Sequence, residues 1–152
     1  MSKAYADTGF IASLYLEETT SDDAEAIFEA HGSPLPLTPL VFLELRNAFN
    51  LAVKRGRITE SVRNGLWSRF ESNLADGVFV RTPVESADLY SRARELSDRH
   101  TVREAPRTLD LLHVAAALTL GVREFLTFDF RQHAVAKAEG LRLRPSRLPV
   151  SP

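Results

Sequence analysis

Two aspartates of the chain stand where a carboxylate could bind a metal ion. Asp7 directly follows a predicted strand over residues 3–6, and Asp129 comes two residues after a predicted strand over 125–127. Functional crevices of parallel sheets lie at the carboxyl ends of the strands, so both acids are expected at that edge. Two like charges about 4 Å apart repel by about 4 kcal/mol at an effective dielectric near 20. Such a pair therefore raises its pKa values or binds a divalent cation.

A third acid, Asp110, stands in the first turn of a predicted helix. The segment RTLDLLHVAAAL covers residues 107–118, and residues 111–122 carry no charge. A helix without charges is buried on nearly every side, where an ionised carboxylate is costly. The free N–H groups and the positive dipole end of the helix offer one compensation. A metal ion offers another, and the helix alone does not distinguish them.

The fourth acid, Glu44, lies on a long helix predicted from Thr38-Pro39 to about Arg55. The Thr38 hydroxyl is the expected N-cap, and proline suits the first helical position. At about 100° per residue, Glu44 falls inside the apolar arc of this helix. A boundary position, an ion pair with an arginine and a functional role all remain open for this glutamate.

Together, four carboxylates would make an oxygen-only pocket, which suits Mg²⁺ or Mn²⁺. A metal site of this kind can activate a water molecule and neutralise a phosphodiester during in-line displacement. The glycines form neither a phosphate-binding loop nor a dinucleotide fingerprint. An aspartyl phosphatase would need a second aspartate two positions after Asp7, where this chain has Gly9.

Composition excludes several classes of protein. The chain has 152 residues, which suggests one domain, and a formal net charge of −1, so bulk charge predicts neither nucleic-acid nor membrane-surface binding. The absence of cysteine excludes disulfides, thiol catalysis and thiolate zinc sites. With no signal peptide pattern and no apolar stretch of about 18 residues, a cytoplasmic location is expected.

Predicted strands alternate with one or two helices along the chain, which indicates a parallel sheet covered by helices on both faces. The polar and basic stretch 97–107, which contains Pro106, is predicted to be a loop. The predicted strands cover residues 3–6, 35–37, 78–81, 125–127 and 141–143.

Four motifs occur in an order and spacing that resemble those of PIN-domain ribonucleases, and most closely those of VapC-type toxins. The motifs are AYADTGFIASLY, VFLELRNAF, TLDLLHVAAAL and LTFDF. The resemblance implies a compact α/β/α sandwich around a central five-stranded parallel sheet. It predicts a single PIN-like domain over residues 1–145 and a short tail over 146–152.

The same resemblance implies a metal-dependent ribonuclease that acts as the toxin of a type II toxin–antitoxin pair. It further implies a Mg²⁺ or Mn²⁺ cofactor, an RNA substrate, an antitoxin protein that fills the acidic groove, and a homodimer. Thr8 and Thr127 match hydroxyl positions that support the metal site in this family. Gly9 replaces the usual serine or asparagine, which removes one polar group near the metal. The implied catalytic and metal-binding acids are Asp7, Glu44, Asp110 and Asp129.

Three arginines, Arg103, Arg107 and Arg131, flank the predicted acidic crevice in sequence. Arginine forks suit RNA phosphates, and ordinary solvated surface is the alternative interpretation. His113, three residues after Asp110, is interpreted as a core histidine rather than a ligand. Two rival functions remain: a non-catalytic protein whose acidic groove captures a basic peptide, and a metal phosphoesterase acting on DNA or other phosphate esters.

Overall fold

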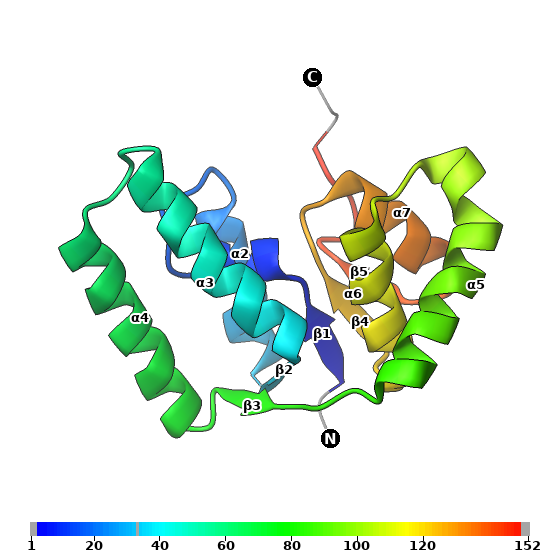
Figure 1. Cartoon of the computed structure of the whole chain (residues 1–152), viewed down its shortest axis with the longest axis horizontal. Helices are drawn as coiled ribbons and strands as arrows, with labels where there is room; N and C mark the ends of the chain where they lie inside the picture. The colour runs from blue at the N-terminus through cyan, green and yellow to red at the C-terminus, as the bar shows by residue number, and fades with distance from the viewer. Residues whose placement is uncertain (1–2, 33, 150–152) are drawn as a thin grey trace. The chain divides into compact units, whose positions relative to one another are not determined.

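The computed structural model describes residues 3–32 and 34–149 (Figure 1). The chain forms two compact units, which we describe separately. The terminal unit joins Met1–Asp7 to Pro83–Pro152, and the middle unit is Thr8–Thr82.

A three-stranded parallel sheet organises the terminal unit, with β4 between β1 and β5 (Figure 1). Ala6 pairs with Leu126 in the register of β1 and β4, so the residues that follow, Asp7 and Thr127, leave the sheet at the same edge. The strands are β1 (Ala4–Ala6), β4 (Glu124–Leu126) and β5 (Arg142–Arg144).

Three helices pack against one another in this unit, and α7 also contacts β5. The apolar α6 is buried from Asp110 to Ala117, which confirms the prediction from its lack of charge. The helices are α5 (Ser86–Glu104), α6 (Thr108–Thr119) and α7 (Phe130–Ala138).

Helix α5 extends through most of the segment predicted to be a loop, so that prediction was wrong for residues 97–104. Only Ala93 and Leu96 of this helix are buried, which leaves a weak apolar periodicity in the sequence. No proline interrupts the helix before Pro106, and the left-handed backbone of Ala105, with φ of 50°, ends it.

The middle unit holds a two-stranded parallel sheet with four helices. Phe70 is fully buried, and its ring contacts those of Tyr15, Phe42 and Trp67, which links several elements into one aromatic core. The elements are α1 (Thr8–Ser13), α2 (Ser21–His31), β2 (Leu35–Leu37), α3 (Pro39–Lys54), α4 (Glu60–Ala75) and β3 (Phe79–Arg81).

Helix α3 starts as the sequence predicts. The Thr38 hydroxyl accepts a hydrogen bond from the backbone N–H of Val41 at 3.5 Å, and Pro39 occupies the first turn. The buried stripe of α3 consists of Val41, Leu45, Phe49 and Ala52.

The predicted α/β class with helix-flanked parallel strands is confirmed, whereas the expectation of five strands in one sheet was wrong. All five predicted strands form within residues 3–32 and 34–149, and their pairing is parallel as predicted, but they make one sheet of three strands and one of two. Alternation along the sequence indicates strands and their direction, whereas pairing partners are decided by long-range packing. Of the predicted tail 146–152, residues 150–152 lie outside the described part of the chain. In that part, no helix combines the length and apolar character needed to cross a membrane.

Candidate functional site

Asp7 is held at the carboxyl edge of the terminal unit's sheet. Its side chain is 3% exposed, and its backbone N–H donates to the carbonyl of Leu126 at 3.1 Å, which extends the β1–β4 ladder by one residue. The Thr127 hydroxyl donates to Oδ2 of Asp7 at 2.6 Å. A short bond of this kind to a charged acceptor compensates part of the cost of burying the carboxylate.

The Thr127 hydroxyl also links Asp7 to Asp129. Its oxygen accepts a hydrogen bond from the backbone N–H of Asp129 at 2.9 Å. One hydroxyl therefore donates to one predicted site acid and accepts from the backbone of another. Thr127 is fully buried, so water does not compete for either bond.

Asp129 is the N-cap of α7. Oδ1 of Asp129 accepts a hydrogen bond from the backbone N–H of Gln132 at 2.9 Å. The cap fixes the carboxylate at the positive end of the helix and leaves Oδ2 for another partner.

Within the described part of the chain, four hydrogen bonds hold the carboxylate of Asp110. It is 2% exposed, and Oδ2 accepts from the backbone N–H of Arg107 at 2.8 Å and from Nε of Arg107 at 3.0 Å. Oδ1 accepts from Nη2 of Arg107 at 3.2 Å and from the side-chain amide of Gln132 at 3.0 Å. Burial raises the pKa of Asp110, but the hydrogen bonds from Arg107 and Gln132 and the Arg107 charge together lower it below its usual value.

Arg107 bridges two of the predicted acids. Its Nη2 atom, already bonded to Asp110, also lies 3.2 Å from Oδ2 of Asp129. The guanidinium is 65% exposed, while the side chains of Asp110 and Asp129 are 2% and 26% exposed. Two carboxylates thus share a single cation that solvent can reach, and its positive charge offsets only one of their two negative charges.

Gln132 is a member of this network that the sequence reasoning missed. It is 6% exposed and donates to Asp110, while its Oε1 atom is buried without a hydrogen-bond partner in the described part of the chain. The signal was present, because Asp129-x-x-Gln132 has the spacing of a capping box. In a capping box the glutamine would bond to the N–H of Asp129. Thr127 already satisfies that N–H, so Gln132 reaches Asp110 instead.

Glu44 lies on α3 in the middle unit, at the border of the buried stripe. Its Oε1 atom accepts a hydrogen bond from the Thr8 hydroxyl at 2.9 Å. Thr8 is 8% exposed and begins α1, one residue after Asp7 in the chain. The bond fixes the orientation of a half-buried carboxylate that the sequence placed in the apolar arc.

The remaining candidate residues are two arginines and one histidine. Arg103, in the last turn of α5, and Arg131, in the first turn of α7, are exposed. His113 is 2% exposed, and its Nδ1 atom lies 2.7 Å from the Tyr5 hydroxyl, which agrees with its interpretation as a core histidine.

The donor chemistry fits a hard divalent cation, although the ligands are not assembled for one. Among residues 3–32 and 34–149, no group of three or more histidine, cysteine or acidic side chains is arranged to hold a metal ion. The side chains gathered in the terminal unit offer oxygen donors only, as Mg²⁺ and Mn²⁺ prefer. The Arg107 guanidinium lies between Asp110 and Asp129, and Oε1 of Gln132, which has no hydrogen-bond partner in the described part of the chain, adds a neutral oxygen to this network.

Comparisons with known proteins agree with this architecture. A crystal structure of FitAcB from Neisseria gonorrhoeae resembles the chain with a TM-score of 0.64 at 17% identity, covering 92% of this chain and 95% of that one. No curated protein matches the sequence. The sequence model of the PIN domain matches residues 4–138. Because that match spans most of the 152 residues, the chain belongs to the PIN domain family.

Proposed function

We propose that this protein is a metal-dependent endoribonuclease whose site consists of Asp7, Glu44, Asp110 and Asp129. The observation that carries the proposal is the Arg107 guanidinium shared by Asp110 and Asp129. Two carboxylates that share one cation form an environment that demands positive charge. Membership of the PIN domain family supports the same assignment.

The cofactor we assign is Mg²⁺ or Mn²⁺, held by the four carboxylates once Arg107 withdraws. When bound, it would supply neutralisation of the phosphodiester and an activated water for in-line attack. Arg107 is suited to withdraw, because its guanidinium is mostly exposed and its bonds to Asp129 and to Oδ1 of Asp110 are 3.2 Å long.

The supporting residues fix the carboxylates before substrate arrives. Thr127 fixes Asp7 and the backbone of Asp129, and Thr8 fixes Glu44. The cap at the start of α7 holds Asp129. Positions fixed in this way require little reorganisation during reaction, which is the basis of electrostatic preorganisation. We assign the released Arg107, together with Arg103 and Arg131, to the RNA phosphates.

We further propose that the protein is the toxin of a toxin–antitoxin pair, that it forms a homodimer, and that its antitoxin covers the acidic site with a basic side chain. The Arg107–Asp110–Asp129 bridge supports the last point, because it demonstrates that an arginine fork fits these carboxylates. Light scattering of the purified chain tests the dimer, and growth arrest on expression tests toxicity.

The experiment that tests the function compares RNA and DNA oligonucleotides under Mg²⁺ and under EDTA. The wild-type protein should cleave RNA in Mg²⁺, and EDTA should abolish cleavage. Asp110→Asn and Asp7→Asn should reduce the rate by at least about 100-fold, as expected for loss of a charged group at a reacting centre. Asp98→Asn, on the exposed surface of α5, is the matched control and should cleave normally.

Cleavage of RNA that persists in EDTA would contradict the metal mechanism. Cleavage of DNA alone would identify a different phosphoesterase. Absence of cleavage combined with capture of basic peptides in EDTA would favour the non-catalytic interaction protein.

A further inference from the structure

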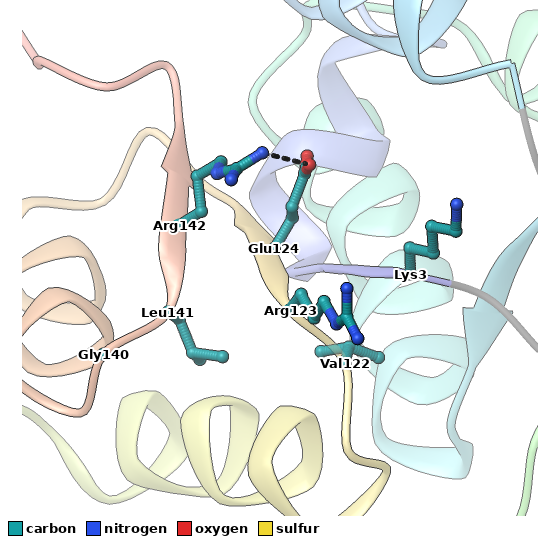
Figure 2. Close-up of a pocket in the computed structure, with 7 residues that line it drawn as sticks. All are labelled: Lys3, Val122, Arg123, Glu124, Gly140, Leu141 and Arg142. Carbon is teal, nitrogen blue, oxygen red and sulfur yellow. Dashed lines mark ion pairs between the residues drawn. The ribbon is translucent and has the colours of Figure 1, made fainter.

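A cavity of about 540 Å³ opens at the amino ends of the terminal unit's strands, the edge of the sheet away from Asp7 and Asp129 (Figure 2). Lys3 precedes β1, Arg123 precedes β4 and Arg142 begins β5. Parallel strands all start at the same edge, so these cations come together although they are far apart in sequence. The lining residues are Lys3, Val122, Arg123, Glu124, Gly140, Leu141 and Arg142.

Backbone hydrogen bonds fix the base of the cavity. The carbonyl of Lys3 accepts from the N–H groups of Arg123 and Glu124 at 2.9 and 3.0 Å. The N–H of Arg142 donates to the carbonyl of Arg123 at 2.9 Å. The three cationic residues are therefore anchored on one rigid ladder, and their side chains extend from it.

The charges around the cavity are unbalanced. Among the described residues that line the cavity, Glu124 is the only acid, and it pairs with Arg142 at 3.6 Å and with the neighbouring Arg144 at 3.4 Å. Within residues 3–32 and 34–149, neither Lys3 nor Arg123 has a side-chain hydrogen bond or ion pair. Figure 2 shows both side chains beside the cavity, separate from the Arg142–Glu124 pair. Positive charge thus remains available for an anion.

An RNA substrate needs such charge away from the acids. The carboxylates at the opposite edge repel phosphates, and the chain's net charge of −1 supplies no general attraction. Arg107, which we assign to RNA phosphates only after its release, is paired with Asp110 and Asp129 in this structure. Asp7 lies four positions after Lys3, about 13 Å along extended chain at 3.3 Å per residue, so the cavity and the predicted site acid Asp7 lie at opposite ends of β1.

We propose that this cavity binds a phosphate of the RNA backbone, with Lys3 and Arg123 as its cationic contacts and Arg142 at its rim. This rests on the proposed ribonuclease function and adds a substrate-binding surface at the opposite edge of the sheet from the predicted site acids Asp7 and Asp129. A volume near 540 Å³ is within the range of small-molecule sites, so a nucleotide-sized group fits.

The experiment measures the affinity of fluorescent single-stranded RNA by anisotropy in EDTA, where no cleavage is needed. The Lys3→Glu/Arg123→Glu variant should weaken binding by at least about 10-fold, and Lys3→Gln/Arg123→Gln should weaken it by less. The logarithmic salt slope of the Gln variant should fall by about 0.7, the value for one phosphate of a single strand that is no longer neutralised. The matched control is Arg92→Glu/Arg94→Glu, which makes the same charge change on exposed positions of α5 and should bind within about twofold of wild type.

Equal losses in the cavity variant and the α5 control would overturn the proposal, because general charge would then explain both. If polyglutamate displaces the RNA from the wild type as readily as unlabelled RNA does, the cavity is a site for acidic peptides and the proposal is overturned. Competition by AMP at concentrations as low as those of unlabelled RNA would also contradict it and would indicate a site for free nucleotides.

RNA binding through the cavity without cleavage in Mg²⁺ would refute the ribonuclease function but not RNA binding by the cavity. Cleavage with normal binding by the cavity variant would refute the cavity alone.

Discussion

The hydroxyl of Thr127 lies 2.6 Å from Oδ2 of Asp7, although 120 positions separate the two residues in the chain. The pairing of β1 with β4 brings them together, because Asp7 and Thr127 follow paired residues of two parallel strands. The buried carboxylate of Asp7 is thereby hydrogen-bonded to the loop that carries Asp129, the next predicted site acid.

Replacing this hydroxyl should destabilise the terminal unit. Thr127→Val should lower the free energy of unfolding by about 1–3 kcal/mol, since it removes one hydrogen bond from the buried Asp7 carboxylate and removes the hydroxyl that accepts from the N–H of Asp129. Chemical denaturation measures the change, and Thr127→Ser should restore most of it. Thr119→Val is the control, because Oγ1 of Thr119 is buried without a hydrogen-bond partner in the described part of the chain. Equal losses in the two valine variants would show that the bonds contribute nothing.

Arg107→Gln should make stability depend on divalent cations. The bridge neutralises a 2%-exposed carboxylate, but Arg107 itself is 65% exposed, so we expect a loss of about 1–2 kcal/mol in EDTA. Saturating Mg²⁺ should recover that loss, and the variant should bind Mg²⁺ more tightly than wild type because no internal cation competes. Thermal denaturation with and without Mg²⁺ measures both effects. Arg94→Gln should show neither the loss in EDTA nor the recovery in Mg²⁺. If Arg107→Gln is as stable as wild type in EDTA, Arg107 does not supply the charge that a metal ion would otherwise supply.

Glu44→Gln tests whether the acid of the middle unit belongs to the site. The amide oxygen still accepts the hydrogen bond from Thr8, so stability should change by less than about 0.5 kcal/mol while RNA cleavage falls by at least 10-fold. Parallel melting curves and cleavage rates separate the two effects. Glu25→Gln, an exposed change on α2, is the control. Normal cleavage by Glu44→Gln would leave Glu44 with a structural role only.

The cluster of Arg99, His100 and Glu139 should stabilise the folded protein near neutral pH, and acid should remove that stabilisation. Burial raises the pKa of Glu139, but hydrogen bonds from His100 and Arg99 and their charges lower it below the ordinary value of 4.5. The folded protein therefore binds this proton less readily than the unfolded chain. The stabilisation is present above pH 4.5 and is lost as the pH falls through the lowered pKa.

Denaturation of wild type and Glu139→Gln across this range measures the contribution. The variant should be less stable by about 1 kcal/mol at pH 6, because Arg99 is 47% exposed and the pair is partly screened. The difference should shrink below pH 4.5. Glu95→Gln on α5 is the exposed control, and a difference that grows in acid would contradict the predicted sign.

Local patterns in the sequence predict most of the elements around the site. The cap at Thr38, the burial of α6 and the acids at the strand ends follow from side-chain chemistry within a few residues. Contacts between residues that are far apart in the sequence cannot be predicted in this way. The sequence alone offers helix N–H groups or a metal ion as the compensation for Asp110. Nothing in it predicts that the Arg107 guanidinium reaches both Asp110 and Asp129, the latter 22 positions away. The division of five strands into two sheets could not be predicted either, because strand pairing depends on contacts between residues far apart in the sequence.

Titration of Mn²⁺ into metal-free protein by isothermal calorimetry tests most directly whether the carboxylates form a metal site. Wild type should bind the ion with release of heat or protons, Asp110→Asn and Asp129→Asn should each weaken binding by at least 10-fold, and Asp98→Asn should bind as wild type does. Wild-type affinity in both site variants, or no binding in any protein, would contradict a metal centre built from these acids.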